Sequence, residues 1–319
     1  AMLVTIRPAP GGIGGVIAAP PSKSMAHRAV LCAALAVGRS HITHLEFSKD
    51  ISATLSAAAQ LCAAVDTGAD NAIVQGLGHF LPLTAPVDCC ESGSTLRFLI
   101  PIASLTGQPV TFTGRGRLME RPQKPYFDLF DEKGISYEQA AGALTVRGTL
   151  TPGEYRLPGN VSSQFFTGLL FALPLLESPS TIVPTTAVES WDYICMTLDA
   201  LAGAGVAVPE PRRGGAFSIS PHPYRSFDRC VEADWSQAGF WYAAIALGSQ
   251  VELEGLNAFS VQGDMAVVPN FLRLTHTGDL DIDVSGIPDL LPPLAVMAAV
   301  RSGTTRFVNA ARLRMNCLL

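Results

Sequence analysis

The chain has 319 residues, 48% of them hydrophobic and only 15% charged, which excludes intrinsic disorder and indicates a sizeable buried core in about two domains. Its net charge of −5 disfavours nucleic acid as a partner, because proteins that bind it usually present a basic face. Its longest apolar stretch, residues 165–176, falls short of the roughly 20 residues of a membrane-spanning helix, so no membrane segment is expected. The first residues lack the basic and apolar regions of a signal peptide, and we predict a cytoplasmic protein.

Five segments along the chain share one plan, in which a small polar or Gly/Pro turn precedes an Ala/Leu-rich helix and a short β-like run follows it. The helical segments lie at residues 21–38, 91–107, 160–178, 234–248 and 287–303, and the β-like runs at 40–45, 108–114, 179–183, 249–256 and 304–308. Successive helix starts are 70, 69, 73 and 53 residues apart, which indicates a repeated α/β unit with a short fourth interval. The predicted helix C-caps are Gly38, Gly107, Gly248 and Gly303.

A second helix is predicted inside each of the first four units, at residues 51–65, 122–133, 191–201 and 265–274. Hairpin-like sequence follows it in the first three units, but after residue 274 the chain runs almost directly into the next helix. Repeats of this length form solenoids or pack around a shared axis. Because the helices are apolar on nearly all faces, for example over 29–37 and 294–300, we predict compact domains with helices buried inside a shell of sheet.

The helix starts carry the residues that suggest chemistry. An α-helix begins with unpaired N–H groups and a partial positive charge, and therefore binds anions readily. The polar residues at the first three starts are Lys23, Ser24 and Arg28; Ser92, Gly93, Ser94 and Arg97; and Ser162, Ser163 and Gln164. Serine is a common helix cap and arginine a common ion-pair partner, so each start taken alone has a structural explanation. Their repetition in an acidic chain favours a site for a small anionic ligand.

Other motifs are weaker. A basic segment contains Arg115, Arg117, Arg121 and Lys124, offset within it only by Glu120. Seven cysteines form no C-x-x-C pair, which indicates reduced thiols, mostly in the core, rather than disulfides or a zinc site. The one close histidine pair, at positions 41 and 44, lies in a predicted strand, where ordinary strand polarity is favoured over metal binding. Signature motifs of nucleotide-binding, serine-hydrolase and zinc-protease sites are missing.

At the helix starts the sequence resembles the EPSP synthases of the enolpyruvyl transferase family. Residues 21–29 (PSKSMAHRA) look like the family's first motif, residues 91–99 (ESGSTLRFL) like its second-repeat glycine loop, and residues 117–125 (RLMERPQKP) like its arginine segment. The resemblance, which covers residues 5–314, implies an α/β fold of two domains, an inside-out α/β barrel of repeated βαβαββ units with substrates in the cleft between the domains. A complete three-unit domain would span residues 21–229, and residues 1–20 with 230–319 would form a second domain that is incomplete in this chain.

The resemblance also implies an activity: transfer of the enolpyruvyl group of phosphoenolpyruvate to the 5-hydroxyl of 3-phosphoshikimate. The products would be 5-enolpyruvylshikimate 3-phosphate and phosphate, on the shikimate pathway to aromatic amino acids, without a metal or organic cofactor. The partners would be these small anionic substrates, and we expect a monomer.

Matching positions imply the site residues. For 3-phosphoshikimate they are Lys23, Ser24, Arg28, Ser162, Ser163, Gln164, Ser190 and Asp289, with Tyr193 close by. For phosphoenolpyruvate they are Lys23, Gly93, Arg121 and Gln164, and Arg97 would be partly structural. The resemblance makes Asp289 the acceptor of the hydroxyl proton, whereas spacing alone favours a carboxylate that stabilises a helix dipole. Lys23 would neutralise phosphate or shuttle a proton.

The pattern departs from the family after residue 314, where the family continues with a Lys-Glu-Ser/Thr-Asp-Arg motif and this chain reads Met-Asn-Cys-Leu-Leu. A hairpin that the family has before Gly278 is also missing. Two functions therefore stay open: an active enolpyruvyl transferase, or an inactive relative that binds only 3-phosphoshikimate. Among enzymes, the alternative is a UDP-N-acetylglucosamine enolpyruvyl transferase, which lacks the PSKS start and carries a loop cysteine nucleophile that has no counterpart here.

Overall fold

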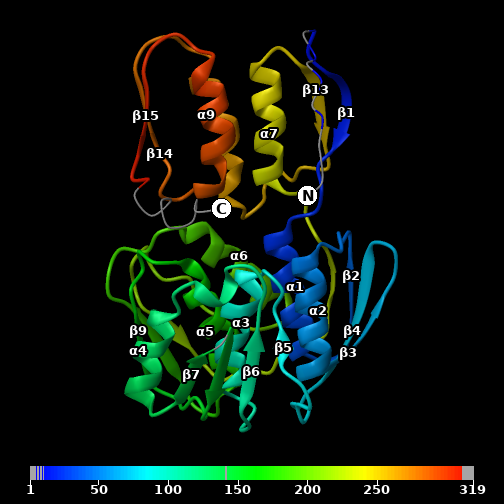
Figure 1. Cartoon of the computed structure of the whole chain (residues 1–319), viewed down its shortest axis with the longest axis vertical. Helices are drawn as coiled ribbons and strands as arrows, with labels where there is room; N and C mark the ends of the chain where they lie inside the picture. Colours follow the sequence, from blue (N-terminus) through cyan, green and yellow to red (C-terminus); the bar gives the residue numbers. More distant parts are fainter. Residues whose placement is uncertain (1–4, 6, 8, 10, 141, 311–319) are drawn as a thin grey trace. The chain divides into compact units, whose positions relative to one another are not determined.

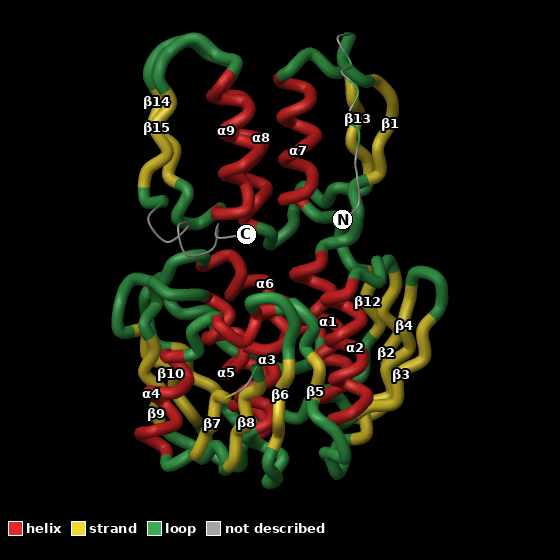
Figure 2. Tube along the Cα trace, in the orientation of Figure 1, coloured by secondary structure: helices red, strands yellow, loops and turns green. Residues whose placement is uncertain are grey.

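The computed structural model describes residues 5, 7, 9, 11–140 and 142–310, which Figure 1 colours along the chain. The chain divides into two compact units. Residues 21–231 form one, here called the three-repeat unit, and residues 1–20 with 232–319 form the other, here called the split unit. Each unit is built from helices and short strands, as Figure 2 shows.

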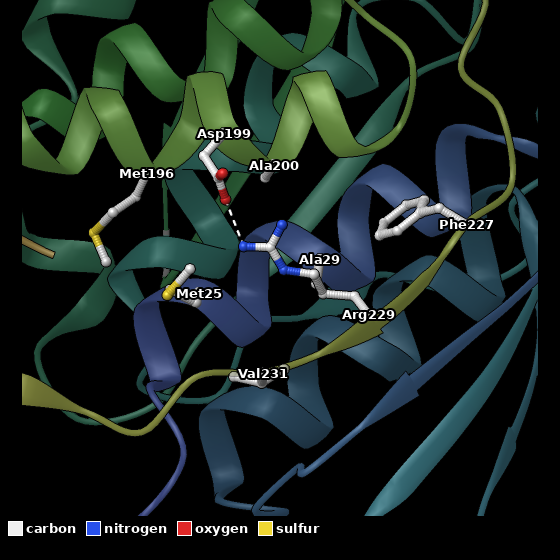
Figure 3. A pocket seen from close by; sticks show the side chains of 8 residues that line it. All are labelled: Met25, Ala29, Met196, Asp199, Ala200, Phe227, Arg229 and Val231. Atoms are coloured by element: carbon white, nitrogen blue, oxygen red, sulfur yellow. Dashed lines mark hydrogen bonds and ion pairs between the residues drawn. The ribbon is translucent and has the colours of Figure 1, made fainter. Parts of the chain in front are cut away.

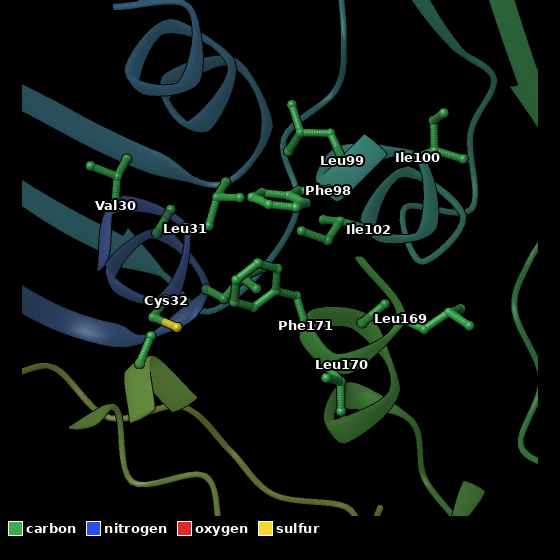
Figure 4. Close-up of a cluster of buried hydrophobic side chains, with 14 of the residues drawn as sticks. Val30, Leu31, Cys32, Phe98, Leu99, Ile100, Ile102, Leu169, Leu170 and Phe171 are labelled. Atoms are coloured by element: carbon green, nitrogen blue, oxygen red, sulfur yellow. The ribbon is translucent and has the colours of Figure 1, made fainter. Parts of the chain in front are cut away.

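Three inner helices form the centre of the three-repeat unit. They are α1 (Lys23–Leu35), α3 (Gly93–Ala103) and α5 (Ser163–Ala172), and each follows a serine at its N-cap. Every residue of α1 from Met25 to Leu35 is buried, because small alanine side chains let neighbouring elements approach on all sides. Leu31, Phe98 and Phe171 come from the three different helices and belong to one apolar cluster (Figure 4). The predicted burial of these helices is confirmed.

Each repeat adds an outer helix: α2 (Lys49–Leu61), α4 (Lys124–Lys133) or α6 (Trp191–Gly203). α2 is amphipathic, with Ile51 and Leu55 buried and Ser52 and Ser56 exposed, so it covers the core with one face. α4 ends at Gly134, whose φ of 69° places it in the left-handed conformation that terminates helices. The short 3₁₀ turns η1 (Leu118–Glu120) and η2 (Leu173–Leu175) complete the helical segments.

Three sheets with equivalent strand arrangements flank these helices, in the orders β12-β2-β4-β3, β5-β6-β8-β7 and β9-β10-β11. The strands are β2 (Val37–Thr43), β3 (Ala63–Thr67), β4 (Asn71–Leu77), β5 (Val87–Asp88), β6 (Val110–Thr113), β7 (Ser136–Ala140), β8 (Ala143–Arg147), β9 (Glu154–Leu157), β10 (Ser180–Pro184), β11 (Phe217–Ile219) and β12 (Asp228–Cys230). In each sheet the strand after an inner helix pairs in parallel with one neighbour and antiparallel with the other. The parallel neighbour in the first sheet is β12, so the end of the third repeat returns to the first.

The split unit follows the same plan with fewer strands. Its helices are α7 (Trp235–Ala246), α8 (Val267–Leu274) and α9 (Leu291–Ala299), and the 3₁₀ turns η3 (Gly263–Ala266) and η4 (Pro288–Leu290) lead into the last two. β1 (Gly14–Ala18) pairs in parallel with β13 (Gln250–Glu254), and β14 (Leu280–Asp283) pairs in parallel with β15 (Thr305–Val308). Among the described residues, neither of these sheets has the antiparallel strands found in the three-repeat unit.

Apolar helices are not buried on all faces in the split unit, so the expectation for residues 294–300 is wrong. Phe240 and Leu247 are 51% and 56% exposed, and Val296 and Val300 are 43% and 54% exposed. A two-stranded sheet covers less of a helix than the three or four strands and the outer helix available to each inner helix of the three-repeat unit. Within the described parts of the chain, every helix is too short or too polar to cross a membrane.

Two further predictions about element ends are wrong. The third repeat has one strand where a hairpin was expected: β11 pairs with β10, while β12 pairs with β2. Of the four predicted caps, Gly248 directly follows the C-cap residue of its helix, whereas α1 ends at Leu35 and Gly38 lies in β2. Val37, expected in the buried helix, is 64% exposed for the same reason. The predicted glycines all have positive φ and shape the turns into the strands.

Candidate functional site

The starts of α3 and α5 lie side by side and are joined by Gln164. Its amide nitrogen donates to Ser94 Oγ at 2.9 Å, and its amide oxygen accepts from Nη1 of Arg97 at 2.8 Å. A Cβ placed on Gly93 would lie 3.0 Å from Nη1 of Arg121 and 3.9 Å from the Gln164 amide oxygen. The missing side chain at Gly93 therefore leaves space between an arginine and a helix start. Three residues predicted for phosphoenolpyruvate are thus brought together.

Two arginines make this cluster positive. Arg97 packs against Phe165, with its guanidinium carbon 4.9 Å from the ring centroid, and its Nε is buried without a hydrogen-bond partner among the described residues. Burial is the main cause that lowers the pKa of Arg97 to about 10, and the charge of Arg121 acts in the same direction. The ion pairs of the described residues include neither arginine. Two nearby cations without a carboxylate partner suit a phosphate or carboxylate ligand.

Arg28 is a second buried cation, between α1 and α6. It is 2% exposed and donates from Nε to Thr197 Oγ1 at 2.9 Å, from Nη1 to the Ser24 carbonyl at 2.6 Å and from Nη2 to the Tyr193 carbonyl at 2.9 Å. Its guanidinium carbon lies 5.2 Å from the Phe98 ring centroid. Burial lowers the pKa of Arg28 to about 10, so the group stays charged at neutral pH. All these acceptors are neutral, and a guanidinium has five N–H donors, so Arg28 has donors to spare for an anion.

Lys23 is the first residue of α1, and its ammonium group forms an ion pair with the Asp50 carboxylate at 2.9 Å. The Lys23 side chain is 56% exposed, so this pair contributes about 0–1 kcal/mol and can be exchanged for a ligand. Asp50 was not among the predicted site residues, because the second helix was expected to begin at Ile51, whereas α2 begins at Lys49. A signal was available: Ser48 caps α2, and acidic residues are favoured in the first turn that follows a cap.

Ser92 and Ser162 cap their helices, the structural role that serine commonly has at a helix start. Ser92 Oγ accepts from the Thr95 N–H at 3.1 Å, and Ser162 Oγ accepts from the Gln164 N–H at 3.3 Å. Ser163 is buried at the first position of α5. Capping leaves a hydroxyl hydrogen available, so it does not exclude contact with a ligand.

Ser190 differs from the other serines. It is the N-cap of α6, it is buried, and its φ of 53° and ψ of 46° lie in the left-handed region that residues other than glycine rarely adopt. Its carbonyl accepts from the N–H of Tyr193, the residue whose own carbonyl accepts from Arg28. A strained residue at a helix start beside a buried arginine is typical of a functional constraint.

The basic segment 115–124 carries less unpaired positive charge in the folded chain than its sequence suggests. Its ion pairs are Arg115–Asp88 at 3.0 Å, Arg117–Glu120 at 3.2 Å and Lys124–Asp128 at 2.6 Å. Glu120 is the one acidic residue within the segment, but carboxylates from outside it, in β5 and in the next turn of α4, also pair with its cations. Within these ten residues, all of them described, Arg121 is the cation outside the ion pairs, and it is the one beside Gly93.

Asp289, the predicted proton acceptor, belongs to the split unit, whereas the other predicted site residues belong to the three-repeat unit. It is exposed in η4, one turn before α9, where an acidic group also stabilises a helix dipole. Among the described residues, no group of histidine, cysteine or acidic side chains has an arrangement that could hold a metal ion. The six described cysteines are free, with three of them buried, while Cys317 and the motif after residue 314 lie outside the described residues.

A small pocket lies between α1, α6 and the β12 segment (Figure 3). Its lining is mostly apolar, including Met25, Met196 and Phe227, and an ion pair of 2.5 Å between Arg229 and Asp199 crosses it. None of the predicted site residues lines it. The candidate site is instead the group of helix starts.

This arrangement defines the class of protein. Repeated α/β units bring three positively polarised helix starts together, and arginines without ion pairs stand beside them. The chain is an α/β protein of the enolpyruvyl transferase fold, with helix starts suited to small anions.

Comparison with known proteins gives the family. The family model for EPSP synthase (3-phosphoshikimate 1-carboxyvinyltransferase) matches residues 8–318. Curated proteins of that name from Clostridium kluyveri and Clostridium beijerinckii are each 41% identical over 96% of this chain and 76% of their own length. A structure of EPSP synthase from Acinetobacter baumannii has a TM-score of 0.78 at 20% identity, over 95% of this chain and 75% of its own. The chain belongs to the EPSP synthase family and spans about three quarters of the length of these relatives.

Proposed function

We propose that the chain transfers the enolpyruvyl group of phosphoenolpyruvate to the 5-hydroxyl of 3-phosphoshikimate and releases phosphate, a step on the shikimate pathway to aromatic amino acids. Membership of the EPSP synthase family supports this function. The observation that carries it is the set of cations without carboxylate partners at the helix starts, Arg28, Arg97 and Arg121. Both substrates carry a phosphate and a carboxylate, and a planar guanidinium binds either group through two hydrogen bonds.

The 3-phosphoshikimate site is proposed around the starts of α1, α5 and α6. Its residues are Lys23, Ser24, Arg28, Ser162, Ser163, Gln164, Ser190 and Asp289. The spare donors of Arg28 and the hydroxyls of the capping serines would bind the anionic groups, because an anion at these starts also meets unpaired backbone N–H groups.

The phosphoenolpyruvate site is proposed over the start of α3, with Lys23, Gly93, Arg121 and Gln164. A ligand can approach the backbone closely at Gly93, beside the Arg121 guanidinium. Gln164 contacts groups of both helix starts, so it would lie between the two substrates.

The reaction protonates the methylene carbon of phosphoenolpyruvate, and the positive charge that develops on the neighbouring carbon attracts the 5-hydroxyl oxygen. The hydroxyl loses its proton, the bond between that carbon and the phosphate oxygen breaks, and loss of a methyl proton restores the double bond. Asp289 is the proposed acceptor of the hydroxyl proton. Lys23, which is exposed and held by one carboxylate, would neutralise the phosphate or carry a proton.

We propose that the folding domains are residues 21–229 and residues 1–20 with 230–319, which the division of the chain after residue 231 supports. We also propose a cytoplasmic monomer. Light scattering of the purified chain tests the monomer, and a single-chain mass is the expected result.

A phosphate-release assay tests the function. The chain is expected to release phosphate only when phosphoenolpyruvate and 3-phosphoshikimate are both present, and Lys23→Met and Arg121→Ala should each lower the rate about a hundredfold or more. Lys124→Met is the matched control, because Lys124 is paired with Asp128 on the surface of α4. No turnover with retained binding of 3-phosphoshikimate would favour the inactive relative, and wild-type rates in both variants would overturn the site.

A further inference from the structure

Each outer helix of the three-repeat unit places one hydroxyl between two inner helices. Thr54 of α2 lies between α1 and α3, Tyr126 of α4 between α3 and α5, and Thr197 of α6 between α5 and α1. All three are fully buried, at 0% exposure. We call them the bridging hydroxyls. The predicted function gives them no role, because they lie beneath the helix starts.

Thr54 joins the first and second repeats. Its Oγ1 is 2.7 Å from Nδ1 of His27 and 2.7 Å from Oγ1 of Thr95, and Thr95 Oγ1 donates in turn to Ser92 Oγ at 2.7 Å. Thr54 Oγ1 also donates to the Asp50 carbonyl at 3.3 Å, so its one hydrogen is directed to that carbonyl or to Thr95. In both cases His27 is the donor, from Nδ1. Burial lowers the pKa of His27 to about 3, so the ring is neutral and keeps this single donor. The chain of bonds ends at the cap of α3.

Tyr126 joins the second and third repeats. Its hydroxyl lies 2.9 Å from the Arg97 carbonyl and 3.0 Å from the Phe165 carbonyl, one on each inner helix. Gly168 faces the same hydroxyl, and a Cβ at this position would overlap it and lie 2.5 Å from the Arg97 carbonyl. The glycine thus allows the close approach of α3 and α5 that the bridge spans.

Thr197 joins the third repeat to the first. Its Oγ1 accepts from Nε of Arg28 at 2.9 Å, lies 2.9 Å from Oγ1 of Thr167, and donates to the Tyr193 carbonyl at 3.1 Å. Because Thr197 donates its one hydroxyl hydrogen to the Tyr193 carbonyl, it accepts a hydrogen bond from the Thr167 hydroxyl. The bridge therefore holds the buried cation of α1 against both α5 and α6.

The bridges contact only the first six residues of each inner helix. The rest of these helices is joined by apolar contacts, which are not directional and tolerate small shifts. Buried hydrogen bonds are directional and costly to leave unmade, so they select one arrangement. We propose that Thr54, Tyr126 and Thr197 are positioning residues that set the spacing of the three anion-binding helix starts. The ligand part of this proposal rests on the proposed function.

Thr54→Val and Thr197→Val test the proposal, because valine keeps the shape of threonine and removes the bridge. Thr54→Ser and Thr197→Ser restore the hydroxyl and serve as rescue variants. Thr111→Val is the matched control: Thr111 also loses a hydroxyl contact, 2.9 Å to Thr145, but this contact joins β6 to β8 away from the helix starts. Tyr126→Phe gives a third test that adds no new atoms.

The first readout is hydrogen exchange of the full chain without ligand. We expect the first turns of the joined inner helices to exchange about tenfold faster in the valine variants, with their C-terminal turns and the Thr111→Val protein unchanged. The second readout is titration calorimetry with 3-phosphoshikimate. Its Kd should rise about tenfold in Thr197→Val and stay within about twofold of wild type in Thr197→Ser.

Unchanged exchange at the helix starts of folded valine variants would overturn the positioning role, whether or not the ligand binds. Equal loss of binding in Thr111→Val would also overturn it, because a general loss of stability would then explain the effect. A wild-type chain that fails to bind 3-phosphoshikimate would overturn the proposed function, while the exchange experiment would still decide the role of the bridging hydroxyls.

Discussion

Replacing Arg28 by methionine should make the chain more stable and weaken its ligand binding. Arg28 is buried at 2% exposure, and its hydrogen-bond acceptors are neutral. The carbonyls of Ser24 and Tyr193 lie inside helices and keep their backbone bonds without it, and Thr197 keeps its own donation to Tyr193. The substitution therefore removes a charge and leaves few groups unsatisfied.

The lowered pKa of Arg28 gives the magnitude. A fall from 12.5 to about 10 corresponds to about 3 kcal/mol that the charged form loses on burial. The contact with Phe98 offsets part of this, by about 0.5–2 kcal/mol, and methionine fills most of the volume. We expect the free energy of unfolding of Arg28→Met to rise by about 1–2 kcal/mol. The Kd for 3-phosphoshikimate should rise about a hundredfold, because charged hydrogen bonds of about 1.5–3 kcal/mol each are lost.

Urea unfolding and titration calorimetry on the same preparations measure both effects. Arg229→Met is the matched control with the opposite sign, because Arg229 forms an ion pair with Asp199 at 2.5 Å and its removal leaves a half-buried carboxylate alone. A fall of more than about 1 kcal/mol in the stability of Arg28→Met would refute the view of Arg28 as a cation held in readiness for an anion. An unchanged Kd would refute its role in binding.

Three further substitutions test other parts of the structure. Gly93→Ala should fold normally, because the added methyl meets the movable end of the Arg121 side chain at 3.0 Å. In calorimetry it should weaken phosphoenolpyruvate binding about tenfold and leave 3-phosphoshikimate binding unchanged. Equal losses of affinity for both ligands would contradict the placement of phosphoenolpyruvate at Gly93. Burial lowers the pKa of His27 from 6.5 to about 3, so below pH 6.5 the unfolded chain binds a proton that the folded chain does not. The free energy of unfolding of the wild type should therefore fall by about 2 kcal/mol between pH 6.5 and 5, measured by urea unfolding. His27→Asn should reduce this dependence on pH. Parallel curves for the two proteins would show that another group is responsible. Gly168→Ala should lower the melting temperature by several degrees, because its methyl overlaps the Tyr126 hydroxyl between α3 and α5. Adding Tyr126→Phe should restore little of the melting temperature, because the methyl also meets the Arg97 carbonyl. A wild-type melting temperature for Gly168→Ala would refute the close packing of α3 and α5.

The helices were predictable because their signal is local. Apolar residues at helical spacing and polar turns before them located α1, α3 and α5 to within a few residues. The strand pairings were not predictable, since β12 joins β2 across almost the whole three-repeat unit, and nothing in residues 228–230 indicates that partner. The exposed faces of α7 and α9 were missed for a related reason: their sequence is as apolar as that of α1, and burial depends on what covers a helix.

The candidate site divides in the same way. The helix starts themselves were predictable, because serine, glycine and basic residues next to a helix start form a local anion-binding pattern. Their partners were not. Asp50 is 27 residues from Lys23, and Thr197 is 169 residues from Arg28, so only the folded chain shows that these residues meet. Threonine in an outer helix is also an ordinary residue there, and its role appears only when both neighbours are in place.

The repeat topology explains why the helix starts suit anions. Each inner helix leads into an equivalent strand, β2, β6 or β10, so the three helices run in the same direction. Their starts gather, as the hydrogen bond of Gln164 to Ser94 and the contact of Arg28 with Phe98 show. Each start carries roughly half a positive charge, and like charges brought together repel. Asp50 neutralises part of this charge by pairing with Lys23, whereas Arg28 and Arg97 have no ion-pair partner among the described residues. The packing of the core and the bridging hydroxyls hold this arrangement together, and an anion at the helix starts removes the repulsion. On the proposed function, the same feature that costs stability without ligand would supply affinity for the ligand.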